Sequence, residues 1–397
     1  MSIIARRILN MEESATLKMA NLAWELKDQG KDVISLSLGE PDFNTPQFVK
    51  DAAIEAIHND FTHYPPVPGY KDVRQSICEK FKRDNGLEFT PEQIVISTGA
   101  KHSLMNICLA LVNPGEEVIL PAPYWVSYHA MASFAEAKIV EIKTGIENDF
   151  KITPEQLEEA LTENSKLFIF SNPCNPSGSV YSKDELIALA QVFEKYPKCY
   201  IVSDEIYEHI NFDDECFSIG TVESIKDRVI TVNGVAKGFA MTGWRIGYLG
   251  ASKEVASACT KLQGQFTSGA NTIAQKATAA AVQADPKKIE EMKQTFLKRR
   301  DLVIELLKSI EGLGVNIPKG AFYVFPDVSS YLGKSVNGQT IKTADDLCMY
   351  LLEDGLVATT SGESFGCPQN IRISYANSEE QLKEAIKRLK NSLAKLS

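Results

Sequence analysis

The sequence lacks several features that mark particular classes of protein. No apolar run approaches the roughly 18 residues that a transmembrane helix needs. Basic residues are outnumbered, 42 Lys and Arg against 52 Asp and Glu, and the net charge of −10 argues against nucleic acid or an anionic membrane as a partner. The first ten residues resemble no secretory signal. We therefore expect a cytoplasmic, soluble globular chain that acts on small molecules.

Paired cysteines and clustered histidines are also missing. The eight cysteines form no C-x-x-C pair, and several lie in apolar segments such as 107–109, where we expect buried thiols. None of the five histidines has the spacing of a metal-binding motif. The sequence therefore predicts no metal site.

The common nucleotide-binding and hydrolase signatures are absent or misplaced. No G-x-G-x-x-G opens a helix and no G-x-x-x-x-G-K-[ST] occurs, so dinucleotide and P-loop sites lack their motifs. Residues 362–366 match G-x-S-x-G, but the turn-like segment 367–370 follows the serine where a nucleophile elbow requires a helix. An acyl hydrolase is not indicated.

What is present is a long alternation of strand and helix patterns. A length of 397 residues corresponds to two domains at about 150 residues each. Near-continuous apolar runs predict strands at 93–98, 117–121, 138–143, 166–171, 199–204, 228–233 and 244–250. The helical patterns between them favour a doubly wound, mainly parallel α/β sheet over about 90–285. We predict a large domain over 46–288 and a smaller α+β domain formed by 289–397 together with the arm 1–45.

A lysine in an unusually uncharged segment is the first candidate for chemistry. Residues 229–250 contain only two charged side chains, Lys237 and Arg245. Among apolar neighbours, desolvation lowers the pKa of a lysine and makes it a nucleophile toward aldehydes. The alternative is an exposed loop lysine.

Three further segments place polar groups where α/β sheets bind ligands. Asp204 ends a buried strand, where a carboxylate can hold a protonated ring nitrogen or merely cap a turn, and Tyr207 follows it. Ala100 and Lys101 open a helix after a strand, which suits an anion at the helix N-terminus. Two prolines flank Asn175 in a rigid turn after another strand.

Taken together, these motifs resemble the aspartate aminotransferase family of pyridoxal-phosphate enzymes. The resemblance runs from LGEPDF at 38–43 to IRISY at 371–375, and includes SDEIYEH at 203–209 and AKGFAMTGWRIG at 236–247. It implies a three-layer α/β fold with a seven-stranded, mainly parallel sheet and a second, smaller domain. It also implies pyridoxal 5'-phosphate as cofactor, and a homodimer with shared active sites.

The resemblance assigns roles to individual residues. Lys237 would bind the cofactor covalently and later move the substrate proton, and Asp204 would pair with the pyridine nitrogen. The remaining cofactor contacts would come from Asn175 and Tyr207 at the phenolic oxygen, Trp125 on the ring, and Ala100, Lys101, Arg245 and the partner's tyrosine equivalent to Tyr64 at the phosphate. Arg372 and Gly39 would meet the substrate α-carboxylate, beside Trp125 and Asn175.

Two departures from the wider family bear on specificity. Gly234 stands three places before Lys237, where a phosphate-binding hydroxyl residue is common. The segment 261–268 contains no arginine to read a distal carboxylate. In the branch resembled here, a lysine at the position of Lys101 has that role, assisted by the segment 14–16. A dicarboxylic substrate is therefore expected.

The expected reaction is ping-pong amino transfer from L-aspartate to 2-oxoglutarate, giving oxaloacetate and L-glutamate. A prephenate, aromatic or alanine aminotransferase and a pyridoxal-phosphate C–S lyase remain open within the same fold. A cofactor-free binding protein and a nicotinamide dehydrogenase are alternatives from other classes.

Overall fold

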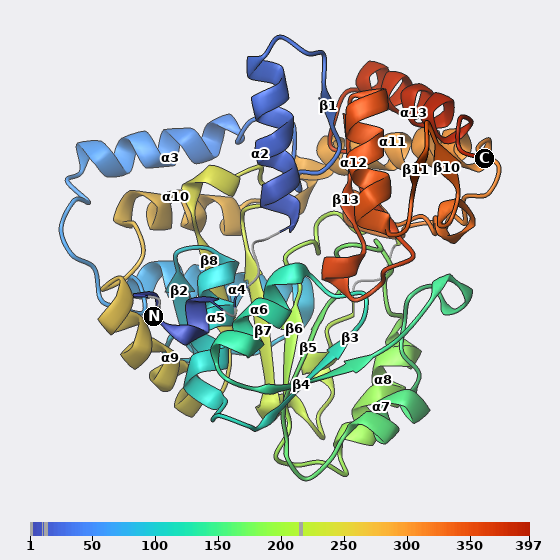
Figure 1. Ribbon diagram of the computed structural model, residues 1–397. Coiled ribbons are helices and arrows are strands. Elements are labelled where there is room, and N and C mark those ends of the chain that lie inside the picture. Colours follow the sequence, from blue (N-terminus) through green and yellow to red (C-terminus); the bar gives the residue numbers. More distant parts are fainter. Residues whose placement is uncertain (1–2, 10, 12–14, 214–216) are drawn as a thin grey trace.

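A seven-stranded sheet forms the centre of the chain in a computed structural model that describes residues 3–9, 11, 15–213 and 217–397. Its strands lie in the order β2-β8-β7-β6-β5-β3-β4 (Figure 1). All neighbours run parallel except β8, which is antiparallel to both β2 and β7. The strands are β2 (Ile94–Ser97), β3 (Glu117–Pro121), β4 (Lys138–Ile142), β5 (Ser165–Ser171), β6 (Tyr200–Asp204), β7 (Val229–Gly234) and β8 (Gly247–Gly250). The predicted mainly parallel α/β sheet is confirmed.

Helices cover both faces of this sheet and make the fold three-layered. Ile201 packs into the core beneath α7 and α8, whereas its neighbour Val202 packs into the core beneath α5, α6 and α9. Burial on both faces explains why the strands are continuous apolar runs. The helices of this region are α3 (Gln47–His58), α4 (Lys71–Asn85), α5 (Ala100–Leu111), α6 (Val126–Phe134), α7 (Pro154–Ala160), α8 (Lys183–Phe193), α9 (Lys253–Phe266) and α10 (Thr272–Gln283).

The two ends of the chain pack into a separate hydrophobic cluster. Met19 and Ala23 of α2 share this cluster with Phe296 of α11 and Leu382 of α13, and β1 pairs in parallel with β12. Figure 1 shows α2 beside α12. The division at about residues 45 and 289 stays a prediction. The elements are α1 (Arg6–Leu9), α2 (Ala15–Asp28), β1 (Ile34–Ser35), α11 (Glu290–Lys308), β9 (Tyr323–Val324), β10 (Ser335–Val336), β11 (Gln339–Thr340), α12 (Ala344–Gly355), β12 (Val357–Ala358), β13 (Thr360–Ser361), β14 (Ile371–Ser374) and α13 (Glu379–Leu393).

Local signals account for several element boundaries. The side chains of Thr153, Ser182 and Ser378 cap α7, α8 and α13 by accepting a hydrogen bond from a backbone N–H of the first turn. The prediction for 244–250 began the strand too early. Trp244 closes a 3-10 turn and Arg245 has a left-handed φ of 55°, so β8 begins only at Gly247.

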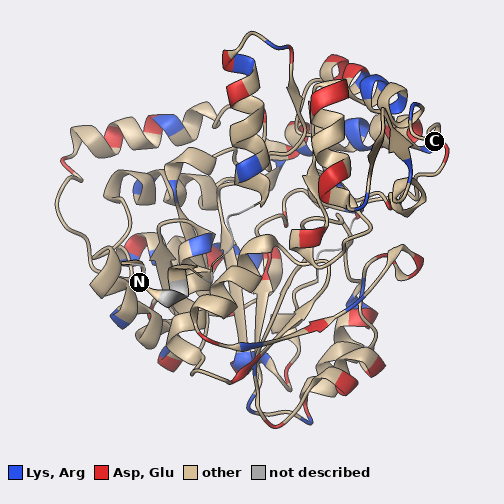
Figure 2. Cartoon of the chain, in the orientation of Figure 1, with Lys and Arg blue, Asp and Glu red and all other residues tan. Residues whose placement is uncertain are grey.

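Charged side chains lie mainly on the outer helices, while most of the sheet is uncharged (Figure 2). All seven described cysteines are buried free thiols, and Cys216 lies outside the described residues. The segment 362–366 contains a short 3-10 turn, Glu363–Phe365, and leads into β14 rather than into a helix. Within the described ranges, no helix is long and apolar enough to cross a bilayer, and no group of His, Cys, Asp or Glu side chains is arranged to hold a metal ion.

Candidate active site

A cavity of about 310 Å³ opens at the carboxyl ends of β5, β6 and β7, beside the cluster formed by the chain ends. This position is where open α/β sheets bind ligands. Every predicted site residue except Tyr64 lines it: Gly39, Ala100, Lys101, Trp125, Asn175, Asp204, Tyr207, Lys237, Arg245 and Arg372. Tyr64 lies elsewhere and is 93% exposed. Thr16 also lines the cavity, whereas Ser14 lies outside the described residues.

Lys237 follows β7 and points into this cavity. Its Nζ donates a hydrogen bond to the backbone oxygen of Gly39. Burial lowers the pKa of Lys237 to about 8, and the positive charges of Arg372 and Arg245 act in the same direction, against the attraction of Glu40 and Asp204. A substantial fraction of neutral amine is therefore present near physiological pH, as a nucleophile or proton carrier requires.

Asp204, the last residue of β6, has a buried carboxylate. Its Oδ2 accepts a hydrogen bond from the Tyr128 hydroxyl at 2.6 Å, and its Oδ1 accepts one from the Ile206 backbone N–H at 3.3 Å. Burial raises the pKa of Asp204 to about 6, and these hydrogen bonds and Lys237 only partly oppose the rise. Among the described residues no cation forms an ion pair with this carboxylate, so it is suited to meet a cationic ligand group.

Arg372, on β14, is a buried cation that is suited to meet an anionic ligand group. It is 1% exposed, and its guanidinium lies 4.6 Å from the Tyr323 ring and 5.1 Å from the Phe365 ring. Its Nη1 donates to Asn175 Oδ1 at 3.0 Å and its Nη2 to the Ser37 backbone oxygen at 2.5 Å. Its buried Nε has no hydrogen-bond partner, and the described chain supplies no carboxylate to it. A desolvated, unpaired guanidinium is a strong site for a planar carboxylate.

A second positively charged part of the cavity lies at the start of α5. Gly99 has a φ of +85°, and a Cβ there would lie 2.4 Å from Arg245 Nη2, so glycine permits the guanidinium to approach the helix N-terminus. Glycine is equally required at position 247, where a Cβ would lie 2.1 Å from the Ala100 backbone nitrogen. The free N–H groups of the helix and the Arg245 cation together form a phosphate-sized anion site.

Lys101 and Trp125 form one wall of the cavity. The Lys101 Nζ lies 4.9 Å from the centroid of the indole ring. Burial, followed by repulsion from Arg245, lowers the pKa of Lys101. No carboxylate among the described residues forms an ion pair with either cation.

Two tyrosines complete the site and were missed by sequence reasoning. The Tyr323 hydroxyl lies 2.7 Å from that of Tyr207, and a Cβ on Gly39 would come 2.1 Å from the Tyr323 oxygen. Tyr128 follows Trp125 by one helical turn and supports Asp204. Neither tyrosine stands in a segment that carries a local signal of function.

The structure also gives a packing reason for Gly234. A Cβ there would lie 3.1 Å from the Gly247 Cα and 3.1 Å from the Ile246 backbone oxygen. Glycine therefore allows β7 and β8 to pair closely at the edge of the cavity. Because this position is glycine, no hydroxyl is available from it to an anion.

Comparisons with known proteins agree with this geometry. Residues 31–389 match the model of the family described as aminotransferase class I and II. The chain is 43% identical over 395 residues to an aspartate/prephenate aminotransferase of Nitrosomonas europaea, covering 98% of this chain and all of the relative. The structure of the aspartate aminotransferase from Rhizobium meliloti superposes with a TM-score of 0.96 at 41% identity, covering both chains fully. That of the Thermus thermophilus enzyme with maleate gives 0.92 at 40% identity, covering 99% of this chain and 100% of the other. The chain belongs to the aminotransferase class I and II family.

Proposed function

We propose that this protein transfers the amino group of L-aspartate to 2-oxoglutarate with pyridoxal 5'-phosphate as cofactor, giving oxaloacetate and L-glutamate. One observation carries the substrate assignment. Arg372 and Lys101 face one cavity as cations for which the described chain provides no ion-pair partner. Two such cations suit a substrate with two carboxylates. The family membership and the names of the relatives support the reaction class.

The residues present fit the cofactor. Arg245 and the N-terminus of α5 would hold its phosphate, Asp204 its pyridine nitrogen, and Asn175 and Tyr207 its phenolic oxygen. Trp125 would cover the ring. When bound, pyridoxal phosphate supplies an electron sink that allows the Cα–H bond of an attached amino acid to break. The orphaned, buried Nε of Arg372 is the structural sign that the cavity is built for a further, anionic group.

Each residue would then contribute one physical effect. Arg372 binds the α-carboxylate and orients the amino acid in the cavity. Lys237, with its lowered pKa, would take a proton at Nζ from the substrate Cα. It would then release this proton to the carbon that receives the amino group. Asp204 remains anionic when it faces a cation, and thereby stabilises positive charge at the pyridine nitrogen. The Gly39 backbone oxygen holds the Lys237 amine close to where the proton is removed.

Lys101 would bind the second carboxylate of the substrate. This role also fits prephenate, since several relatives are named aspartate/prephenate aminotransferase and prephenate carries two carboxylates. Prephenate is therefore the second candidate acceptor. In either case the distal charge of the ligand, rather than its size, would distinguish it from phenylalanine or alanine.

The test is a half-reaction screen. The cofactor-loaded protein would be mixed with aspartate, glutamate, phenylalanine, alanine and arogenate, and its visible absorbance followed. We expect rapid conversion with aspartate. Lys101→Met should weaken aspartate binding by roughly tenfold and leave phenylalanine unaffected. Lys288→Met is the matched control, because Lys288 also lies over an aromatic ring, 4.4 Å from the Phe48 centroid, but outside the cavity. Faster conversion by phenylalanine than by aspartate would refute the dicarboxylate assignment.

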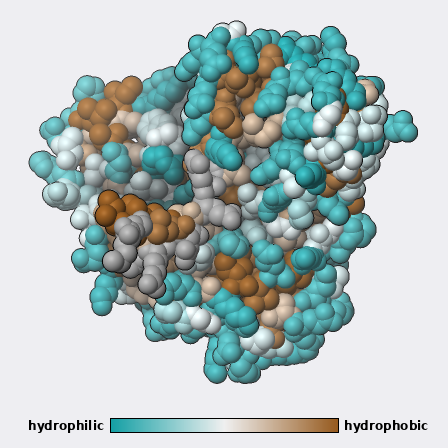
Figure 3. Space-filling view, in the orientation of Figure 1, coloured by the Kyte–Doolittle hydropathy of each residue, from teal (hydrophilic) through white to brown (hydrophobic). Residues whose placement is uncertain are grey.

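We further propose that two copies of the chain form a dimer with shared sites. Exposed apolar side chains support this: Figure 3 shows them over α3 and near the N-terminus, and they include Ile54, Ile57, Ile8 and Leu9. Tyr64 is 93% exposed and does not line the cavity of its own chain. It would complete the phosphate site of the second copy.

Subunit mixing tests this arrangement. A Lys237→Ala chain and a Tyr64→Ala chain should each be nearly inactive alone. A hybrid dimer would contain one intact site, with Lys237 from one chain and Tyr64 from the other, so mixing and reassembly should restore activity. If verified hybrid dimers showed no restored activity, the proposal of shared sites would be contradicted.

A further inference from the structure

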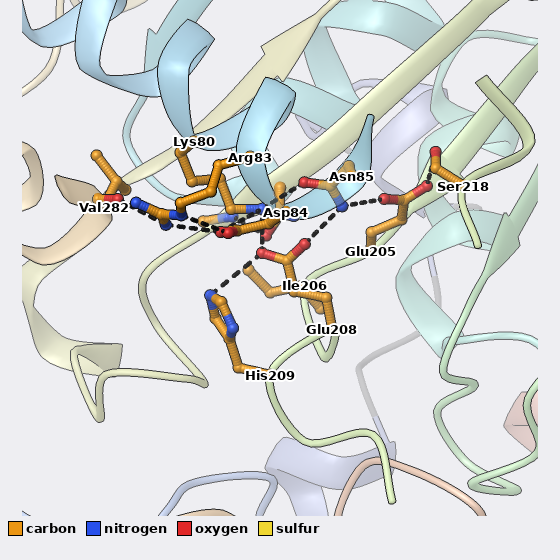
Figure 4. Close-up of polar contacts among 12 residues, drawn as sticks. Lys80, Arg83, Asp84, Asn85, Glu205, Ile206, Glu208, His209, Ser218 and Val282 are labelled. Carbon is orange, nitrogen blue, oxygen red and sulfur yellow. Dashed lines mark hydrogen bonds and ion pairs between the residues drawn. The ribbon is translucent and has the colours of Figure 1, made fainter. Parts of the chain in front are cut away.

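The turn after β6 has two opposite faces with different surroundings. Asp204 and Tyr207 line the cavity. Glu205 and Glu208, each one residue further along, do not line it and are only 2% and 8% exposed. Figure 4 shows their carboxylates in a buried polar cluster with side chains from the end of α4. The two proposed cofactor ligands and the two buried glutamates thus share one short segment.

Glu205 is held by three hydrogen bonds, from three different parts of the chain. Its Oε1 accepts from the hydroxyls of Ser203 at 2.9 Å and Ser218 at 2.6 Å. Its Oε2 accepts from the Asn85 amide nitrogen at 3.0 Å. The carboxylate therefore ties the end of β6 to α4 and to the segment that contains Ser218.

Asn85 joins the two glutamates to each other. The same amide nitrogen donates to Glu208 Oε2 at 2.7 Å, and its oxygen accepts from Lys80 Nζ at 2.7 Å. Lys80, which is 1% exposed, also forms an ion pair with Glu208, and His209 lies 3.3 Å from the same carboxylate (Figure 4). One amide at the C-terminus of α4 thus fixes both carboxylates.

Such a cluster is an unfavourable way to fill a core. Burying carboxylates and an ammonium has a desolvation cost that apolar side chains of similar volume avoid. What hydrogen bonds add is direction, since each restricts the position and orientation of its partners. Beyond Asp204 one further ladder bond runs from the Glu205 N–H to the Val232 backbone oxygen at 2.9 Å, and the turn then keeps mainly the bonds from Glu208 N to Glu205 O at 3.0 Å and from Ile210 N to Tyr207 O at 2.8 Å. The side-chain cluster therefore adds restraint to a turn that lies beyond this last ladder bond.

We propose that Glu205 and Asn85 are positioning residues, which hold Asp204 and Tyr207 in place from behind the cavity. The inference rests on the proposed function, because it concerns the residues that would contact the cofactor. Neither Glu205 nor Asn85 touches the cavity. Their effect is transmitted through one short turn, in which every proposed ligand is adjacent to an anchored glutamate.

The chain contains a matched control for this proposal. Glu117, at the amino end of β3, is a buried carboxylate that accepts from the hydroxyls of Thr162 at 2.5 Å and Ser165 at 3.2 Å and from Lys138 Nζ at 3.0 Å. It resembles Glu205 in burial and in its number of donors, but it lies at the end of the sheet away from the cavity. Glu117→Gln and Glu205→Gln therefore each remove a buried carboxyl group with three donors, at opposite ends of the strands, although Lys138 pairs with Glu117 and burial raises the pKa of Glu205 to about 7.

The experiment compares wild type, Glu205→Gln and Glu117→Gln by two measurements other than turnover. The first is the Kd of the cofactor-free protein for pyridoxal phosphate, and the second is the pH midpoint of the visible absorbance of the loaded protein. We expect Glu205→Gln to raise the Kd on the order of tenfold and to shift the midpoint. Glu117→Gln should change thermal stability alone. Equal Kd values and midpoints for the two variants would overturn the proposal.

A milder variant keeps the test decisive if Glu205→Gln fails to fold. Ser218→Ala removes one donor to Glu205 and leaves its carboxyl group in place, and we expect a rise in Kd of roughly threefold in the same direction. A folded Ser218→Ala protein with wild-type Kd and midpoint would also refute the proposal. Wild-type protein that binds no pyridoxal phosphate would instead refute the proposed function, so the two failures are distinguishable.

Discussion

Replacing Asp204 by Asn should stabilise the cofactor-free protein while impairing cofactor binding. Burial raises the pKa of this carboxyl from an ordinary value near 3.8 to about 6. The folded state therefore holds the proton more tightly than the unfolded state does, and it loses relative stability as the pH rises from about 4 through 6. Above pH 6 the full difference of about two units corresponds to a cost of about 3 kcal/mol.

Asparagine removes this cost and keeps nearly the same shape. The Tyr128 hydroxyl can still donate to the amide oxygen, whereas the amide nitrogen would face the Ile206 N–H, so one hydrogen bond worth about 1 kcal/mol is lost. We expect a net gain of about 2 kcal/mol in the free energy of unfolding at pH 7.5. At pH 5 wild-type Asp204 is already largely protonated in the folded state, so the gain should be smaller by about 1.4 kcal/mol.

Urea unfolding of the cofactor-free proteins at pH 5 and pH 7.5 measures both values. Added pyridoxal phosphate should reverse the order, because wild type gains binding free energy that the variant lacks. Asp149→Asn is the control: burial also raises the pKa of Asp149, but this residue lies outside the cavity, so cofactor affinity should not change. A variant less stable than wild type at both pH values by the same amount would refute the electrostatic reasoning. Unchanged cofactor affinity would refute the role of Asp204.

Three further predictions concern neighbouring groups. Arg372→Lys should lower kcat/KM for every amino acid substrate by roughly 100-fold in steady-state assays, because an ammonium cannot form two parallel hydrogen bonds to a carboxylate; a loss confined to aspartate would contradict this. Borohydride trapping of pyridoxal phosphate by the cofactor-free protein should increase with pH, with a midpoint near 8 that reflects the lowered pKa of Lys237. A midpoint near 10.5 would contradict the effect of burial on this pKa. Tyr323→Phe removes the hydroxyl that pairs with Tyr207, and should weaken pyridoxal phosphate binding by about fivefold in equilibrium titration, whereas unchanged affinity would exclude that contribution.

Features with a local signal could be predicted from the sequence. The strand at 117–121 has its predicted bounds, because a β-branched apolar run is nearly sufficient to form a strand covered on both faces. Ser182 and Ser378 cap α8 and α13, and such caps have a local sequence signal because a cap depends on neighbours only a few positions away. Lys237 was found because its segment is unusually uncharged, and Asp204 because it ends a buried strand, where an α/β sheet binds ligands.

Other contacts depend on packing between distant segments and leave no local trace. The Tyr128 hydroxyl reaches Asp204 across 76 positions, and Asn85 reaches Glu205 across 120. Tyr323 lies in the apolar run 321–325, to which no role was assigned from the sequence, yet its hydroxyl meets Tyr207 and its ring covers Arg372. The early start predicted for β8 has a similar origin, because the left-handed backbone at Arg245 is not encoded by residue type.

Ion pairing distinguishes two buried structural groups from the two buried charges of the cavity. Arg299 binds Asp42 through two hydrogen bonds of 2.6 and 2.8 Å, and Lys80 pairs with Glu208. In contrast, Arg372 and Asp204 are just as deeply buried, but the described chain provides no ion-pair partner for either. An unpaired buried charge destabilises the folded protein, and a ligand of opposite charge relieves that cost when it binds. Because Asp204 can be relieved only by a cation and Arg372 only by an anion, the cavity is complementary to a ligand that carries both charges. The net charge of −10 sums all charged residues of the chain and therefore does not describe the few groups that meet the ligand.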